Sequence, residues 1–169
     1  RVVLSKYAAI APQEWRFEAN PHGRPTVANK NARAGRIAFN LSHTSGLSVL
    51  GVTRDGAIGV DVESAGVQRA AVEIADRFFA PEEVAALREL PSAEQPRRFV
   101  EYWTLKESYI KARGLGLSIP LDGFGFDLSR AGGARLAIAP SLRDVPNRWR
   151  FWQFAATTQH LLAVCALRT

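Results

Sequence analysis

Two turns divide residues 36–63 into three alternating segments, and this run limits the possible folds more than any other part of the sequence. Apolar and polar side chains alternate with a period of two in each segment, which is typical of strands. The turns at 42–46 and 54–56 are short enough to close hairpins. The pattern therefore predicts a three-stranded antiparallel meander with strands at 36–42, 47–53 and 57–63.

Helical periodicity follows the predicted meander. Apolar spacing predicts helices at 67–79 and 81–90, and then a longer helix that ends at Gly114. A short helix is also predicted at 2–10, before the meander. Strand-like segments return near the end of the chain, at 121–128, 135–139, 148–154 and 161–168. This order of elements indicates an α+β fold with antiparallel sheets.

The composition indicates which partners and which cellular compartment to expect. The formal net charge is +6, which favours acidic partners such as nucleic acid, an anionic membrane, a polyphosphate or an acidic protein. No apolar run reaches the roughly 20 residues that a membrane span needs. The one cysteine, Cys165, lies in an apolar run and is expected to be buried. Without a possible internal disulfide, we expect the cytoplasm.

The first residue is Arg1, and the sequence contains no methionine. We therefore expect that the chain starts inside a longer protein. In that case part of the functional machinery would lie upstream.

In residues 58–63, apolar side chains alternate with a glycine and two acidic side chains. In the predicted strand the apolar side chains face a core, whereas Gly59, Asp61 and Glu63 face the other way. Two carboxylates about 7 Å apart on one strand face can share an Mg²⁺ ion, which prefers a few carboxylates with phosphate oxygens and water. The alternative is an ordinary strand whose polar face lies in solvent.

The long predicted helix carries a carboxylate between two lysines. At about 100° per residue, Lys106, Glu107 and Lys111 fall within an arc of about 140°. The apolar side chains of Trp103 and Ile110 lie in the same arc, so we expect the charged groups to be held near the body of the protein. Such groups suit phosphate transfer. The alternative is that Glu107 and Lys111 only form an i,i+4 pair that supports the helix.

Residues 40–46 form a predicted polar turn that contains Ser42 and His43. Small hydroxyl side chains, backbone amides and a histidine suit contacts with phosphate. The same residue types are what any hairpin needs. The turn alone therefore leaves ligand binding and plain turn formation open.

Together these segments resemble the 4′-phosphopantetheinyl transferases, specifically the larger Sfp-type group. The motifs of that family stand here, in the family's order, as Phe39-Asn40-Leu41-Ser42-His43, Gly59-Val60-Asp61-Val62-Glu63 and Trp103-Thr104-Leu105-Lys106-Glu107-Ser108-Tyr109-Ile110-Lys111. Residues 114–121 also look like the family, as does Gly23-Arg24-Pro25, where Gly-Lys-Pro is usual. The likeness covers most of residues 1–128, and three motifs in order are a more specific signal than any one of them.

The resemblance implies a pseudosymmetric α+β fold of two similar subdomains, with antiparallel sheets each packed on a long helix. Coenzyme A would bind in the cleft between them. We expect residues 1–56 to be the remainder of an incomplete N-terminal subdomain, and residues 57–169 to be the C-terminal subdomain with the metal and catalytic residues. A chain with two halves would form its own cleft, which favours a monomer.

The implied reaction moves the 4′-phosphopantetheine arm of coenzyme A to a serine of an acyl or peptidyl carrier protein and releases 3′,5′-ADP. The resemblance assigns Asp61, Glu63 and Glu107 to an Mg²⁺ ion and makes Glu107 the general base. Lys106 and Lys111 would bind phosphate oxygens, and one of them would assist the departure of ADP.

Further site residues follow from the same resemblance. Ser42, His43 and Arg24 would contact phosphates of coenzyme A, although arginine at position 24 changes the donor geometry of the usual lysine. Some family members use another acid for the metal, and alignment of Phe78-Phe79 makes Glu83 the match. The Glu82-Glu83 pair also simply suits a helix N-terminus, and both interpretations stay open.

Carrier proteins are acidic around the modified serine, so the net charge of +6 would aid encounter. The alternatives are a basic nucleic-acid-binding module, another Mg²⁺-dependent phosphotransferase and an inactive fragment that binds coenzyme A. The basic residues are scattered, and no signature of a nucleic-acid-binding motif appears in the sequence. A phosphate loop of the Gly-x-x-x-x-Gly-Lys-Ser/Thr type is also missing, which counts against ordinary ATP use. The residues do not select among fatty acid, polyketide, nonribosomal peptide and siderophore biosynthesis.

Overall fold

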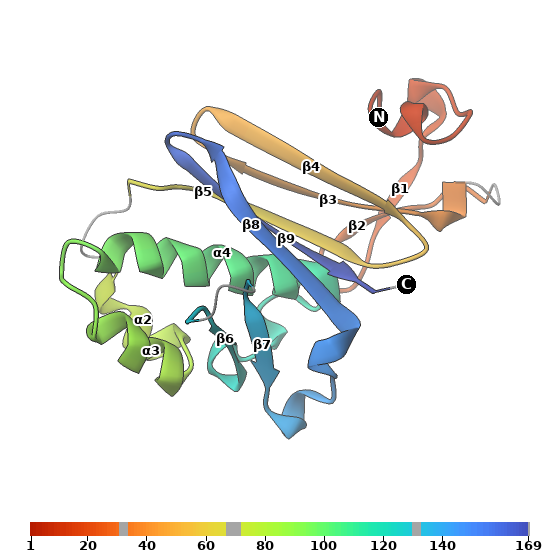
Figure 1. Cartoon of the computed structure of the whole chain (residues 1–169). Helices are drawn as coiled ribbons and strands as arrows, with labels where there is room; N and C mark the ends of the chain where they lie inside the picture. The colour runs from red at the N-terminus through yellow and green to blue at the C-terminus, as the bar shows by residue number, and fades with distance from the viewer. Residues whose placement is uncertain (31–33, 67–71, 130–132, 169) are drawn as a thin grey trace.

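The computed structural model of the chain describes residues 1–30, 34–66, 72–129 and 133–168. It has the expected α+β composition (Figure 1). The strands are β1 (Phe17–Ala19), β2 (Pro25–Val27), β3 (Ile37–Thr44), β4 (Leu47–Arg54), β5 (Ile58–Ser64), β6 (Phe124–Asp127), β7 (Arg135–Ile138), β8 (Trp149–Thr157) and β9 (His160–Leu167). The helices are α2 (Ala75–Phe78), α3 (Pro81–Arg88) and α4 (Gln95–Arg113).

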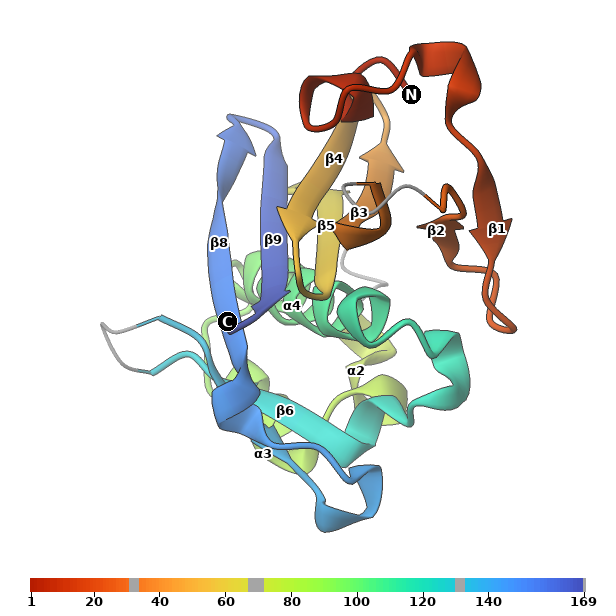
Figure 2. The same ribbon diagram turned by 90° about the vertical axis from the view of Figure 1, so that its right-hand side faces the viewer.

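Helix α4 lies at the centre of the fold, between two layers (Figures 1 and 2). The antiparallel sheet β5-β9-β8 packs on one side of it, and α3 with the β6–β7 hairpin packs on the other. The main hydrophobic core therefore surrounds the helix, and includes the buried side chains of Leu105, Tyr109 and Phe124. The predicted helix end is confirmed, since Gly114 adopts a φ of 67° and its N–H bonds to Ile110 O at 3.0 Å.

The predicted hairpin of the first two meander strands is confirmed. Strands β3 and β4 pair antiparallel from Ile37 opposite Arg54 to Thr44 opposite Leu47. The third step of the meander is wrong, because β5 pairs with β9 and not with β4. Local alternation identifies a strand, whereas its partner is chosen by packing between distant segments.

Side chains of β3 bond to the main chain of β5 where a strand ladder would otherwise run. Asn40 Oδ1 accepts a hydrogen bond from Val60 N at 2.8 Å, and Ser42 Oγ accepts one from Val62 N at 3.3 Å. The two strands lie beside each other in the same direction, with Asn40 and Ser42 both buried. This seam joins the β3–β4 hairpin to the β5-β9-β8 sheet.

Gly59 lets β5 approach α4 closely. A Cβ atom at this position would lie 2.0 Å from Ser108 O and 2.4 Å from Ala112 N, both of which are main-chain atoms of the helix. Only glycine allows such an approach. As a result, the face of β5 that carries Asp61 and Glu63 lies directly against the helix.

Other predicted elements are confirmed only in part. The strands predicted after residue 120 appear as β6, β7, β8 and β9. The helix predicted at 2–10 is wrong, since only a short 3₁₀ turn forms there, at Leu4–Lys6. Part of the helix predicted at 67–79 lies outside the described residues. Within the described part of the chain, no helix has the length and apolar character to span a membrane.

Candidate active site

Strand β5 lies against α4 (Figure 2). Polar side chains of β3, β5 and α4 come together there. Asp61 of β5 is 3% exposed, and its Oδ1 lies 2.6 Å from the Nζ of Lys111 on α4. Ser42 of β3 donates to the same Oδ1 at 3.1 Å, and its Oγ also accepts from Lys111 Nζ at 3.1 Å. Side chains from β3 and α4 therefore contact the same carboxylate of β5.

The second oxygen of Asp61 has no partner. Asp61 Oδ2 is buried and makes no hydrogen bond. Burial raises the pKa of Asp61, against the opposing charge of Lys111. A buried carboxylate oxygen without a donor is costly, so this atom marks a place where a cation or another donor would be stabilised.

Two further carboxylates face the same region. Burial raises the pKa of Glu107, and the negative charges of Asp61 and Glu63 raise it further. Burial and the charge of Asp61 likewise raise the pKa of Glu63, while a hydrogen bond with the Trp103 side chain lowers it. The three acids therefore repel one another, and a positive ion among them would relieve that repulsion.

The residues fit a magnesium ion in their chemistry, because Mg²⁺ binds carboxylates together with substrate phosphates and water. In the described ranges, no three histidine, cysteine or carboxylate side chains stand close enough to hold a metal ion as they lie. Since Lys111 holds one oxygen of Asp61, an ion would bind the other oxygen. The carboxylates of Glu63 and Glu107 would then have to turn toward it.

Lys106 and Glu83 do not belong to this cluster, which corrects two of the expected roles. Lys106 Nζ is fully buried, 2.7 Å from Glu83 Oε2, and donates to Leu121 O at 2.8 Å and to Phe124 O at 2.5 Å. Glu83 accepts from two main-chain N–H groups, those of Ala80 and Phe126. All polar atoms of the pair are thus occupied on the side of α4 that faces α3 and β6.

The physical reason for this separation is that α4 is buried on two sides. The predicted arc of about 140° is wide enough for its ends to face different layers. Lys111 and Glu107 face β5, whereas Lys106 faces the layer of α3 and β6. Neither a phosphate contact by Lys106 nor metal binding by Glu83 agrees with these contacts.

Arg24 has a structural position at the end of α4, and its expected phosphate contact remains a prediction. Its guanidinium donates to the carbonyls of Lys111 and Ala112 at the end of α4, and to Ile58 O at 2.8 Å. Cationic donors at a helix C-terminus satisfy carbonyls that the helix leaves free. Arg24 thus fastens the β1–β2 segment to α4 and β5.

The predicted turn at 42–46 is shorter than expected. Strand β3 continues to Thr44, so Ser42 and His43 point to opposite faces of the strand. Ser42 is buried beneath Lys111, whereas His43 is exposed. The structure brings Ser42, and not His43, to Asp61, and a contact between His43 and a phosphate remains a prediction.

Two positioning residues were missed by the sequence analysis. Asn40 holds the main chain of β5 one residue before Asp61, and the Trp103 side chain acts on Glu63 by lowering its pKa. Both belong to the motifs quoted above. The signal that could have identified them was a polar atom on a side chain that otherwise appears to be part of a core or a turn.

Comparisons with known proteins match the same part of the chain to one enzyme superfamily. The model of the 4′-phosphopantetheinyl transferase superfamily matches residues 57–165, which include the three carboxylates and Lys111. The chain belongs to this superfamily. It is 33% identical over 166 residues to the 4′-phosphopantetheinyl transferase Sfp of Bacillus subtilis, covering 98% of this chain and 69% of Sfp. It is also 37% identical to the transferase ffp of Bacillus subtilis, which confirms the resemblance to the Sfp-type group.

The chain spans only part of some relatives. It is 33% identical to the 4′-phosphopantetheinyl transferase HetI of Nostoc, covering 83% of this chain and 59% of HetI. A crystal structure of the holo-(acyl-carrier-protein) synthase from Bacillus anthracis, in complex with CoA, superimposes with a TM-score of 0.53 and 15% identity, covering 66% of this chain and 94% of the synthase. At that identity the match concerns the fold, and it confirms the expected transferase fold.

Proposed function

We propose that this protein transfers the 4′-phosphopantetheine arm of coenzyme A to a serine of an acyl or peptidyl carrier protein. The observation that carries the proposal is the group of Asp61, Glu63, Glu107 and Lys111 where β5 meets α4, with one buried oxygen of Asp61 left without a partner. Membership of the superfamily supports the same reaction.

In this reaction the serine hydroxyl oxygen attacks the phosphorus that carries the pantetheine arm. A new phosphorus–oxygen bond forms while the bond to 3′,5′-ADP breaks, and ADP leaves with the electron pair. Glu107 takes the serine proton, directly or through a water molecule, and its raised pKa suits it for that task. Lys111 stabilises negative charge on the phosphate oxygens.

We propose Asp61, Glu63 and Glu107 as the ligands of an Mg²⁺ ion. When bound, the ion would neutralise charge on the departing phosphate. We further propose an acidic carrier protein as the partner, because the net charge of +6 favours encounter with it. A monomer in the cytoplasm is part of the same proposal, and the buried free thiol of Cys165 agrees with a reducing compartment.

The test is the intact mass of an apo carrier protein after incubation with this protein, coenzyme A and Mg²⁺. We expect a gain of one phosphopantetheine arm, and loss of that gain after chelation or in Glu107→Gln. The matched control is Glu82→Gln, because Glu82 is exposed on α3, away from the cluster.

Two results would contradict the proposal. A mass gain that survives in Glu107→Gln would remove Glu107 from the chemistry. A protein that remains folded and binds coenzyme A, but modifies no carrier even when it is extended to the length of Sfp, would be a binding protein and not a transferase.

A further inference from the structure

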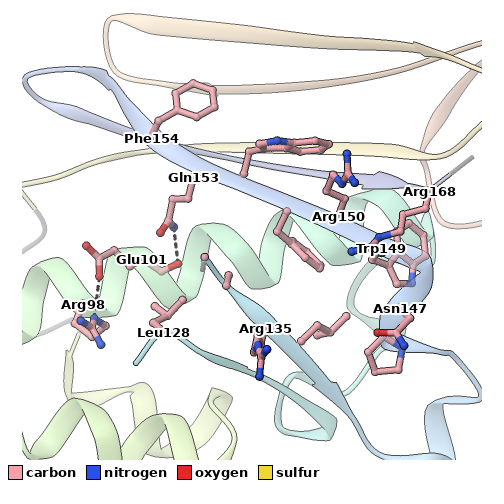
Figure 3. A pocket seen from close by; sticks show the side chains of 16 residues that line it. Arg98, Glu101, Leu128, Arg135, Asn147, Trp149, Arg150, Gln153, Phe154 and Arg168 are labelled. Carbon is pink, nitrogen blue, oxygen red and sulfur yellow. Dashed lines mark hydrogen bonds and ion pairs between the residues drawn. The ribbon is translucent and has the colours of Figure 1, made fainter. Parts of the chain in front are cut away.

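A groove of about 1160 Å³ runs along β8, on the sheet edge farthest from β5 (Figure 3). Every residue from Trp149 to Phe154 lines it. Neighbouring residues of a strand point to opposite faces, so both can line one groove only where the groove follows the edge of the strand. Residues 133–136, at the start of β7, form part of the opposite wall.

The main chain of β8 is open along this edge. Within the described residues, β8 pairs with β9 alone. Arg168 N donates to Arg148 O at 2.7 Å, and Arg150 lies opposite Ala166 in the ladder. Because ladder bonds alternate along an antiparallel pair, the N–H and C=O groups of Phe151 and Gln153 point away from β9 and into the groove. The N–H of Trp149, at the start of the strand, is already bonded to Pro146 O.

The side chains of the groove are basic and aromatic. Arg135, Arg150 and Arg168 are exposed there, whereas the one acid, Glu101, is already bound by Arg98 at 2.8 Å. Trp152 and Phe154 are 44% and 50% exposed. Figure 3 shows Gln153 pointing from β8 toward α4 and Phe154 pointing to the other side.

We propose that this groove binds an extended acidic segment of a partner polypeptide, which adds a strand to the open edge of β8. Main-chain groups of the segment would bond to those of Phe151 and Gln153, and its carboxylates would pair with Arg135 and Arg150. An open edge with exposed aromatic side chains is a surface that proteins normally cover or blunt. Between residues 149 and 157 it carries no lysine and no proline, and its one charged side chain, Arg150, is exposed.

A polypeptide fits the groove better than a nucleic acid does. Both would satisfy the arginines, and bases could stack on Trp152 and Phe154. Only another peptide chain, however, offers donors and acceptors at the spacing of a strand edge. The inference goes beyond the proposed transfer reaction, because none of the residues that line the groove belongs to the Asp61 cluster.

The test uses the whole chain and a synthetic acetylated peptide of alternating glutamate and valine. Titration into ¹⁵N-labelled protein should shift the amide signals of Phe151 and Gln153 and slow their hydrogen exchange. The double variant Arg135→Glu/Arg150→Glu should weaken binding by about tenfold or more. Arg16→Glu is the matched control, because Arg16 is exposed on the other half of the chain, and it should bind the peptide normally.

A second peptide, with N-methyl groups along one edge, separates strand addition from simple charge attraction. It should lose binding, because it cannot pair with β8. Equal binding of both peptides would overturn the proposal, as would unshifted amides of Phe151 and Gln153 at millimolar peptide. Amide shifts caused by oligothymidylate instead, or by raising the protein concentration alone, would make the groove a nucleic-acid site or a self-association site.

Discussion

Asp61 is the residue on which the site depends, since it links β5 to β3 through Ser42 and to α4 through Lys111. We expect Asp61→Asn to lower kcat/KM for a carrier protein by about 10²–10³-fold, because it removes the charge that faces Lys111 and that would bind the proposed metal ion. The fold should persist, since the Lys111 side chain is partly exposed and keeps its hydrogen bond to Ser42. Steady-state kinetics with a circular-dichroism melt test this, with the exposed Asp76→Asn as control. Full activity in Asp61→Asn would contradict it.

Glu107 should show a pH-dependent effect on stability in metal-free protein. Its pKa is raised in the fold by burial and then by the charge of Asp61, so the folded state holds this proton more tightly than the unfolded state. The stability contribution is therefore present below the ordinary glutamate pKa and is lost as pH rises through the raised one. We expect Glu107→Gln to melt near the wild type at low pH and above it at pH 8, and melting curves in chelator check this. A variant that melts lower at pH 8 would contradict the sign.

Variants of the buried pair of Lys106 and Glu83 test whether Lys106 contributes to stability or to catalysis. Burial lowers the pKa of Lys106, and breaking such a pair leaves an uncompensated charge. We expect Lys106→Met to cost about 3–5 kcal/mol of unfolding free energy, and the double variant Lys106→Met/Glu83→Gln to regain most of it. Denaturant titration measures this. If the double variant is stable but has lost kcat, Lys106 would contact substrate after all.

The contact of β5 with α4 depends on a single glycine. We expect Gly59→Ala to cost about 3 kcal/mol or more, because its Cβ would meet main-chain atoms that cannot turn aside. The carboxylates on β5 would also move from the helix, so activity should fall together with stability. Gly35→Ala is the matched control, since a Cβ there meets nothing within 4 Å. Equal stability of the two variants in denaturant titrations would refute the close approach.

Side chains of β3 join the β3–β4 hairpin to the β5-β9-β8 sheet. Removing the acceptor in Asn40→Ala leaves Val60 N buried without a partner, which should cost about 1–3 kcal/mol. Because the bond joins the β3–β4 hairpin to β5, hydrogen exchange should speed up at Val60 and Val62 and also in β4. Exchange measured by NMR tests this, with Ser48→Ala on the exposed side of β4 as control. Faster exchange confined to Val60 would mean that the seam does not couple the sheets.

Local patterns in the sequence predicted the strands, the long helix with its end at Gly114, and the carboxylate set of Asp61, Glu63 and Glu107. The strand period and the helix period decide which way such side chains point, and both periods are local properties of the chain. The motifs that contain them also identified the family. These features could be predicted without knowledge of contacts between distant segments.

The tertiary structure alone decided which polar groups meet. It paired β5 with β9, turned Lys106 to Glu83 and used Arg24 to cap α4. Sequence reasoning placed Lys106 in the site because it lies beside Glu107. Helix α4 is covered on two sides, however, and Lys106 faces α3 while Lys111 faces β5. A charged side chain pairs with whichever opposite charge is brought within reach in a low-dielectric interior, and that proximity is set by the packing of whole layers.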